Sequence, residues 1–558
     1  MAARKITGAE ILVKVLIEQG IDIVFGYPGG QVMDIYESLY HHRKEITHIL
    51  TAHEQGAAHA ADGYTRTSGK TGVVIATSGP GATNLVTGLA AAYMDSIPMV
   101  AITGNVPTMQ IGTDSFQEVD ITGITIPITK HNFFVDDVEK LAQILRKAFL
   151  LAGSGRPGPV LIDIPKDIQE AKCYFEEKSP VKKEEAFAAK DIRISEAAEI
   201  INSAKRPYIY FGGGIVSSGA EEELKELAEL IDAPMGCSMM GLSCIPSDNP
   251  RFLGMQGMHG HYASTVTMNK SDVILALGVR FNDRSTNDRL KFEPNAKVVH
   301  IDVDGSELSK TVDAYCGLRG DLKKTLSLLI PQVNRKKNES WWKSIENFKN
   351  EEKALFDKRE GFTPFNIYKV LNDFKNDNTP VVTDVGQHQV WAAQFINFQK
   401  KRRFISNCGL GAMGYGMGAA IGASFGLGGN ERILLITGDG SFGMNLNELA
   451  TAVTYNIPVT ILIINNHSLG MVRQYQTMFY NKHYSATDIN RKTDFVVLAG
   501  AFGLKGKKVD NISGLKEALK ESAVTEGPFI IECPIDKNEP VLPMLKPGGS
   551  TEDIITAI

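Results

Sequence analysis

Two short polar stretches near the C-terminal end of the sequence have residue types that could bind a cation and a phosphate group. Asp439 stands between Gly438 and Gly440 after an apolar run, and Asn466 follows a second such run. Both runs are rich in β-branched residues and a helical segment separates them, so we expect two strands joined by a helical crossover. A right-handed crossover brings the carboxyl ends of both strands to one sheet edge, beside each other.

This arrangement suits a hydrated cation. Carboxylate and amide oxygens are ligands for Mg²⁺, which takes few protein ligands and completes its shell with phosphate and water. The glycines would let backbone amides approach a phosphate at the start of the next helix. The spacing alone leaves a second interpretation open, in which Asp439 caps a helix and Asn466 ends a strand.

A related unit occurs earlier in the sequence. Residues 73–105 and 433–466 both contain a strand pattern, a Gly-x-Gly turn, a helix pattern, Ile-Pro, a second strand pattern and asparagine. Pro80 stands where the second unit has Asp439, so only the second unit could bind a cation through that side chain. The repeat predicts two similar doubly wound domains, one at each end of the chain.

The elements that must position these residues follow from alternating β-branched and helical segments. This alternation is typical of parallel sheets covered by helices, so we predict an α/β fold with three doubly wound, mostly parallel-sheet domains. Two charged stretches, 171–191 and 334–360, have the composition of linkers and exposed helices. The predicted domains are residues 1–170, 192–333 and 361–537, followed by a C-terminal tail at 538–558.

Composition narrows the class of protein. The 558 residues are 43% hydrophobic and 22% charged with a net charge of −5, so nucleic acid and anionic membranes are not expected partners. Six scattered cysteines without C-x-x-C pairs, and an N-terminus that is not a signal peptide, predict a cytoplasmic protein. The uncharged segment 404–430 is too rich in glycine for a membrane span, and we expect a strand, a loop and a buried helix.

Several motifs resemble one enzyme family. Gly-Asp-Gly with the double asparagine resembles the diphosphate signature of thiamine-diphosphate enzymes, and "VFGYPGG", "HEQGAAHAADGYTRTSGKTGV" and "TSGPGATN" resemble their pyrimidine-binding domain. "GTDSFQE", "GRPGPVLIDIPKD", "LGVRFNDR" and "GMVRQYQ" are similar to the acetohydroxyacid synthase family. The resemblance covers nearly the whole chain. It implies decarboxylation of pyruvate and transfer of the two-carbon unit to pyruvate or 2-ketobutyrate, in branched-chain amino-acid biosynthesis, with thiamine diphosphate, Mg²⁺ and FAD.

The resemblance also implies roles for single residues. Glu54 would hydrogen-bond the aminopyrimidine ring and move the proton that activates the cofactor. Gly30 would direct its amide at a developing oxyanion, and Phe116, Gln117 and Lys166 would line the substrate pocket. Ser468 would join Asp439 and Asn466 as a metal ligand. Further cofactor contacts would be Tyr27, Pro80, Asn84, Gly386, Gln387, His388, Met413, Gly438, Gly440, Ser441, Gly470 and Met471.

A flavin site and an acceptor pocket are implied in the same way. "FGGGIVSSG" is not a true G-x-G-x-x-G and is weak support for a dinucleotide by itself. Because the overall reaction is not redox, the flavin would be structural or vestigial. The acceptor pocket would contain Met471, Val472 and Tyr475, and Tyr475 replaces the tryptophan usual in the family, which leaves acceptor preference open. The implied FAD contacts are Arg156, Gly212, Gly213, His259, Arg280, Asp302 and Asp321.

In the family, the pyrimidine domain of one subunit meets the diphosphate domain of another. The resemblance therefore implies a homodimer or dimer of dimers with shared active sites, and a small regulatory subunit as a further partner.

Two alternative functions are those of other thiamine-diphosphate enzymes. Pyruvate oxidase uses FAD for turnover, and glyoxylate carboligase lacks the acid at Glu54. A nucleotide-binding module without catalysis is a third alternative.

Overall fold

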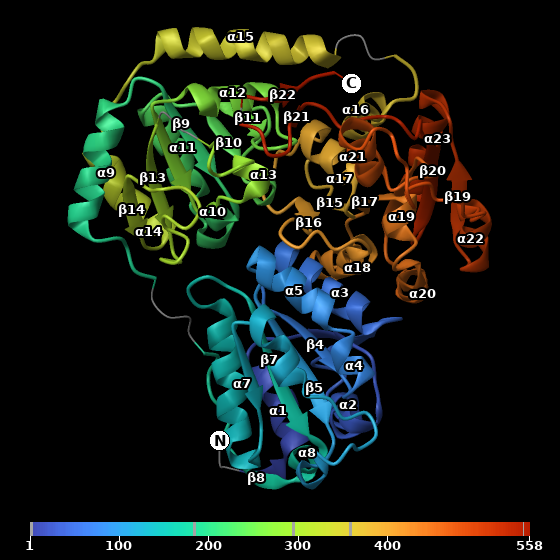
Figure 1. Ribbon diagram of the computed structural model, residues 1–558. Helices are drawn as coiled ribbons and strands as arrows, with labels where there is room; N and C mark the ends of the chain where they lie inside the picture. The colour runs from blue at the N-terminus through green and yellow to red at the C-terminus, as the bar shows by residue number, and fades with distance from the viewer. Residues whose placement is uncertain (1–3, 182–185, 293–295, 357–359, 551, 558) are drawn as a thin grey trace.

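The computed structural model describes residues 4–181, 186–292, 296–356, 360–550 and 552–557. This part of the chain forms three α/β domains, with the N-terminal domain below a central and a C-terminal domain that lie side by side (Figure 1). Each domain is built on a sheet of six parallel strands, which confirms the predicted fold class.

The sheet of the N-terminal domain has the strand order β3-β2-β4-β5-β7-β6. Helix α3 (Glu54–Ser68) follows β3, and α5 (Val86–Asp95) lies in the crossover between β4 and β5. Its strands are β2 (Ile23–Gly26), β3 (Thr47–Leu50), β4 (Gly72–Ala76), β5 (Met99–Asn105), β6 (His131–Phe134) and β7 (Pro159–Pro165).

The sheet of the C-terminal domain has the order β16-β15-β17-β18-β20-β19. With strands counted from the start of each domain, this is the same order as in the N-terminal domain, as the repeated unit predicts. Its strands are β15 (Val381–Thr383), β16 (Phe404–Ser406), β17 (Ile433–Gly438), β18 (Val459–Asn465), β19 (Lys505–Lys508) and β20 (Phe529–Pro534).

The central sheet is different. Its order, β11-β10-β9-β12-β13-β14, has the central reversal typical of dinucleotide-binding domains, because the first strand of the domain lies next to the fourth. Its strands are β9 (Pro207–Phe211), β10 (Met235–Cys237), β11 (Phe252–Met255), β12 (Val273–Leu277), β13 (Lys297–Asp302) and β14 (Cys316–Arg319).

The segments expected between the domains contain regular structure. In 171–191, β8 (Lys172–Phe175) pairs antiparallel with β1 (Arg4–Thr7), and in 334–360 helix α15 (Glu339–Phe356) runs along the top of the molecule (Figure 1). Residues 182–185 and 357–359 of these segments lie outside the described residues. The tail contains a short hairpin of β21 (Met544–Leu545) and β22 (Ile554–Ile555).

The glycine-rich segment 404–430 forms β16, a loop and the buried helix α18 (Tyr415–Gly426), as expected. Among the described residues, no helix combines the length and apolarity that crossing a membrane requires.

Helices α3 and α18 join the N- and C-terminal domains of one chain. A Cβ atom added to Gly418 of α18 would lie 2.7 Å from the backbone oxygen of Gly56 on α3, and one added to Gly422 would collide with the Ala60 carbonyl. The missing side chains therefore let the two helix backbones approach closely. Because α3 begins with Glu54, this contact helps to fix the position of that carboxylate.

Candidate active site

The candidate residues of the N-terminal domain gather at the carboxyl edge of its sheet, where ligands bind in doubly wound folds. Each occupies the loop or helix start that follows a parallel strand, so the topology brings together residues far apart in sequence. Tyr27 and Gly30 follow β2, Glu54 follows β3, Pro80 and Asn84 follow β4, Phe116 and Gln117 follow β5, and Lys166 follows β7.

Glu54 is nearly buried, with 9% exposure, at the first position of α3. The side-chain amide of Asn84 donates a 2.9 Å hydrogen bond to its carboxylate. Gly81 lies close by, since a Cβ atom added there would stand 3.3 Å from the Glu54 carboxylate. The carboxylate therefore has a fixed orientation and packs close to the Gly81 backbone.

The other candidates at this edge differ in their surroundings. Phe116 is 84% exposed, and Gln117 adopts a positive φ of 62° beside the turn that contains Gly79 and Pro80. Lys166 donates to Asp34 at 2.5 Å and also pairs with Glu170, and these carboxylates raise the pKa of its ammonium group. Phe116 is therefore available for contact with a ligand or another chain, but its exposure alone does not identify one.

The candidates of the C-terminal domain occupy the equivalent edge of its own sheet. Since β17 pairs directly with β18, the residues that follow these two strands lie side by side, as the crossover rule predicts. Gly386, Gln387 and His388 follow β15, Met413 follows β16, Gly438 ends β17 before Asp439, Gly440 and Ser441, and Asn466, Ser468, Gly470, Met471, Val472 and Tyr475 follow β18.

The structure separates the roles of the two asparagines. Asn465 points back into the sheet, where its amide donates to Glu532 at 2.8 Å. Asn466 donates to Gln387 at 3.1 Å and accepts from the backbone amide of Ser468 at 3.0 Å. Asn465 is therefore a core residue, whereas Asn466 contacts two other candidate residues, Gln387 and Ser468.

The surroundings of Asp439 fit a hydrated cation with a bound diphosphate. Burial raises the pKa of Asp439 to about 6. Across the described chain no group of three or more His, Cys, Asp and Glu side chains could hold a metal ion. Asp439 would therefore be the only charged side chain among the three proposed ligands, and this matches Mg²⁺, which depends on phosphate and water for the rest of its shell.

A cradle of glycines lies beside Asp439. A Cβ atom added to Gly438 would lie 2.9 Å from the His388 ring, and one added to Gly386 would lie 2.8 Å from the same ring. Burial lowers the pKa of His388 to about 3, so its imidazole is neutral, and its buried Nε2 atom has no hydrogen-bond partner. An unpartnered buried nitrogen at a glycine-lined turn fits a site for a polar group such as a diphosphate.

A cavity of about 1530 Å³ runs between the domains. Its lining includes the three acceptor-pocket candidates Met471, Val472 and Tyr475, together with Gly386. Six of the seven flavin candidates also line it: Arg156, Gly213, His259, Arg280, Asp302 and Asp321. Gly212, the seventh, is the residue before Gly213 at the end of β9 and is not part of the lining.

The flavin candidates carry polar groups suited to a dinucleotide. Both ring nitrogens of His259 are buried without a partner, and burial lowers its pKa to about 3. Arg156 pairs with Glu307 at 2.9 Å, and burial raises the pKa of Asp302 to about 6. These groups provide both donors and acceptors on the wall of one large cavity, which a dinucleotide requires.

Sequence reasoning missed Arg284, the last residue of the "RFNDR" motif. Its guanidinium lines the cavity and donates to the sulfur of Met258 at 2.9 Å and to the Tyr475 hydroxyl at 3.4 Å. The motif contains both arginines, but the resemblance implied a role only for the first of them, Arg280. The side chain of Arg284 places a cation beside the acceptor-pocket residues.

The large cavity does not reach all of the candidate residues, since Asp439, Asn466 and Ser468 are not part of its lining. The lining of the large cavity over the described residues includes none of the catalytic candidates Gly30, Glu54, Phe116, Gln117 and Lys166. Within one chain these five candidates therefore do not share that cavity with Met471, Val472 and Tyr475.

Three family models match the chain in order. They are the N-terminal TPP binding domain of thiamine pyrophosphate enzymes over residues 6–124, the central domain over 194–329 and the C-terminal TPP binding domain over 384–533.

Similar proteins cover nearly the full length. A probable acetolactate synthase large subunit of Methanocaldococcus jannaschii is 43% identical over 99% of this chain and 95% of its own. Acetolactate synthase isozyme 3 large subunit of Escherichia coli is 41% identical over 98% of each chain, and the isozyme 2 large subunit is 42% identical over 98% of this chain and 99% of its own. The chain belongs to the acetolactate synthase large subunits, thiamine-diphosphate-dependent enzymes that make acetolactate.

Proposed function

We propose that the C-terminal domain holds thiamine diphosphate through Mg²⁺, with Asp439, Asn466 and Ser468 as the metal ligands. The hard oxygen donors, the single carboxylate and the glycine cradle around His388 support this assignment. When bound, thiamine diphosphate supplies the electron sink for decarboxylation of a 2-ketoacid.

Glu54 is the proposed proton carrier. It would hydrogen-bond the aminopyrimidine ring and hold or release the proton that activates the cofactor. The Asn84 hydrogen bond supports this role, because it fixes one carboxylate oxygen and leaves the other for a ligand. Gly30, with open space where a side chain would be, would present its backbone amide to the developing oxyanion.

The proposed substrates are pyruvate as donor and pyruvate or 2-ketobutyrate as acceptor, in branched-chain amino-acid biosynthesis. Arg284 would bind the acceptor carboxylate, since its guanidinium lies against Tyr475 in the cavity. Met471, Val472 and Tyr475 would contact the acceptor's alkyl group. Phe116, Gln117 and Lys166 would line the same pocket from the N-terminal edge.

The same cavity is the proposed FAD site, in which the flavin has a structural role. The unpartnered nitrogens of His259 and the mix of arginines and carboxylates on the cavity wall support a dinucleotide. The cavity also reaches the acceptor pocket, so a bound flavin would form part of its wall.

A second copy of the chain is the proposed source of the missing half of each site. The observation that carries this proposal is the absence of the five catalytic candidates from the lining of the large cavity of one chain, together with the exposed Phe116. A homodimer, or a dimer of such dimers, would bring the N-terminal edge of one copy to the C-terminal edge of the other. The relatives named large subunits support a small regulatory subunit as a further partner.

A cytoplasmic location is also proposed. All six cysteines are free thiols and four of them are buried, which suits a reducing compartment.

Two experiments test the proposal. Purified protein should convert pyruvate to 2-acetolactate only with thiamine diphosphate and Mg²⁺ present, and chelation of Mg²⁺ should abolish the product.

The shared site is tested by mixing inactive Glu54→Gln and Asp439→Ala chains after dissociation. Random re-pairing leaves one intact site in each mixed dimer, so about a quarter of the wild-type activity should return. A site contained within one chain would give no recovery.

A further inference from the structure

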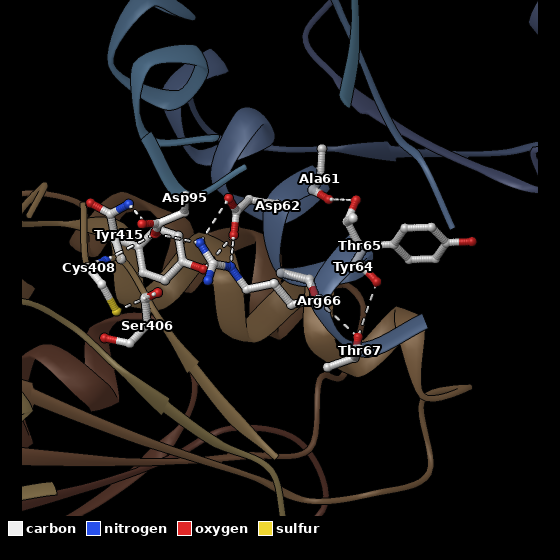
Figure 2. Close-up of polar contacts among 12 residues, drawn as sticks. Ala61, Asp62, Tyr64, Thr65, Arg66, Thr67, Asp95, Ser406, Cys408 and Tyr415 are labelled. Carbon is white, nitrogen blue, oxygen red and sulfur yellow. Dashed lines mark hydrogen bonds and ion pairs between the residues drawn. The ribbon is translucent and has the colours of Figure 1, made fainter. Parts of the chain in front are cut away.

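A buried ion cluster joins the N- and C-terminal domains of one chain (Figure 2). Arg66 of α3 donates from Nε to Asp62 at 2.5 Å and from a terminal nitrogen to Asp95, the last residue of α5, at 2.8 Å. Tyr415, the first residue of α18, donates its hydroxyl to Asp62 at 2.6 Å. Arg66 and Asp95 also contribute to the wall of the large cavity, whereas Asp62 and Tyr415 do not, and none of the four is among the candidate catalytic or cofactor residues.

The cluster contains two buried carboxylates and one guanidinium. Both carboxylates have side chains with 0% exposure, and they face a single guanidinium. Burial opposes the charge on Arg66, but the carboxylates of Asp62 and Asp95 raise its pKa well above its usual value, so it remains a cation. Two buried carboxylates beside one guanidinium need further hydrogen-bond donors, because a buried carboxylate is costly unless it is hydrogen-bonded.

Those donors come from the loop that follows β16. Asp95 accepts from the side-chain amide of Asn407 at 3.1 Å, from the backbone amide of Cys408 at 3.0 Å and from that of Gly409 at 2.7 Å. The approach is close, because a Cβ atom added to Gly409 would lie 2.8 Å from the Asp95 carboxylate. The same three bonds stabilise the Asp95 carboxylate and fix the start of the loop.

The loop carries Met413, a proposed contact of thiamine diphosphate. The side-chain oxygen Oδ1 of Asn407 accepts from the backbone amide of Ala412 at 2.8 Å, so the loop is closed on itself. Beyond Met413, the Gly414 amide donates to Asp384 at 2.9 Å. Met413 is therefore held between two buried carboxylates, one from each domain.

We propose that Asp95 is a positioning residue for the cofactor site: it holds the 407–413 loop, and through it Met413, in the conformation that receives thiamine diphosphate. The inference rests on the proposed contact between Met413 and that cofactor. It means that the N-terminal domain of a chain shapes the cofactor site of its own C-terminal domain.

The alternative is a clamp that only holds the domains together, and the cluster contains a matched control. Asp95→Asn and Asp62→Asn each remove one buried carboxylate charge from the same arginine, but only Asp95 binds the loop. Asparagine at position 95 would turn an NH₂ group towards loop N–H donors in either orientation, which leaves at least one donor unpaired.

The test measures loop order and cofactor affinity separately. Hydrogen–deuterium exchange of peptides covering 407–413, without cofactor, should be faster in Asp95→Asn than in Asp62→Asn and wild type. The Kd for thiamine diphosphate at saturating Mg²⁺, measured by calorimetry, should rise about tenfold in Asp95→Asn and stay within about twofold in Asp62→Asn. The Tm should fall by a similar amount in both variants.

Equal changes of exchange and Kd in the two variants would mean a domain clamp and would overturn the inference, as would wild-type values in Asp95→Asn. If Asp95→Asn does not fold, Asn407→Ala replaces it, since this change keeps every buried charge but removes the link to Ala412. Unchanged loop exchange in Asn407→Ala would then refute the inference. A wild-type Kd in Met413→Ala would reject the proposed Met413 contact, and loop exchange alone would then decide the role of Asp95.

Discussion

Replacement of Tyr475 by tryptophan should shift the choice of acceptor towards 2-ketobutyrate. The Tyr475 hydroxyl donates to the Met258 sulfur, a weak acceptor, at 3.4 Å and accepts from the Arg284 guanidinium at 3.4 Å, near the upper limit for an N–H···O hydrogen bond, so its loss costs only about 0.5 kcal/mol. The ring packs edge-on against Phe479, with centroids 5.6 Å apart. An indole ring in place of the phenol ring would add apolar surface to the pocket wall.

The size of the effect follows from the extra methyl of 2-ketobutyrate. One methylene in an apolar pocket changes the relative transition-state free energy of two substrates by about 1–3 kcal/mol. A partial contact between the new indole and the extra methyl should favour 2-ketobutyrate by about 1 kcal/mol, which is about fivefold in product ratio. The assay is a competition with both acceptors present, in which acetohydroxybutyrate and acetolactate are quantified together.

Tyr475→Phe is the control, because it removes the hydroxyl and keeps the ring. If apolar contact sets the preference, the phenylalanine variant should keep the wild-type ratio within about twofold. An unchanged ratio in Tyr475→Trp would show that this residue does not set acceptor choice. An equal shift in both variants would assign the effect to the hydroxyl and its contact with Arg284, and would refute the argument from apolar surface.

Four further outcomes are expected. Glu54→Gln should lower kcat by about 10²- to 10⁴-fold with the cofactor still bound, as judged by calorimetry, because it removes one acid–base group. Asp439→Ala should instead raise the concentrations of Mg²⁺ and thiamine diphosphate needed for half-maximal activity; equal kinetic and binding defects in both variants would contradict this division. Reduced or deaza-flavin restored to the apoprotein should support acetolactate formation, and strict dependence on oxidised flavin would contradict a structural role. Burial raises the pKa of Asp163 to about 7 despite its hydrogen bonds with Thr103 and Asn105, so the folded state favours the protonated form. The contribution of protonated Asp163 to the free energy of unfolding is complete below about pH 4 and is lost as pH rises through 7, a change of up to about 4 kcal/mol. Asp163→Asn should therefore flatten the fall of Tm between pH 5 and 8. A variant with the wild-type pH profile of Tm would exclude Asp163 as the source of that fall.

The fold was predictable where the chain repeats local signals. Two strand–turn–helix–strand units with nearly equal spacing predicted two similar domains, and both sheets have the same strand order. The crossover rule was sufficient to bring Asp439 and Asn466 to one edge, since its handedness is almost invariant. These inferences needed only local patterns and one general rule of topology.

Other features depended on contacts between distant segments. Asp62 and Arg66 are four residues apart on α3, a spacing that usually indicates an exposed ion pair, but α5 and α18 bury both. The double asparagine could not be divided into a core residue and a site residue, because that depends on Glu532 in a later strand. The contact of Arg284 with Tyr475 could not be predicted for the same reason, because the two residues belong to different domains.

The two domains of one chain support each other's part of the site. Glu448 of the C-terminal domain is fully buried and accepts from the backbone amides of Ala52 and His53 at 3.1 and 3.0 Å, immediately before Glu54. In the opposite direction, Asp95 of the N-terminal domain binds the loop that leads to Met413. Each carboxylate thus fixes the backbone next to a candidate residue on the other domain. A chain whose domains separate would lose the geometry of both halves, even before it meets a second copy.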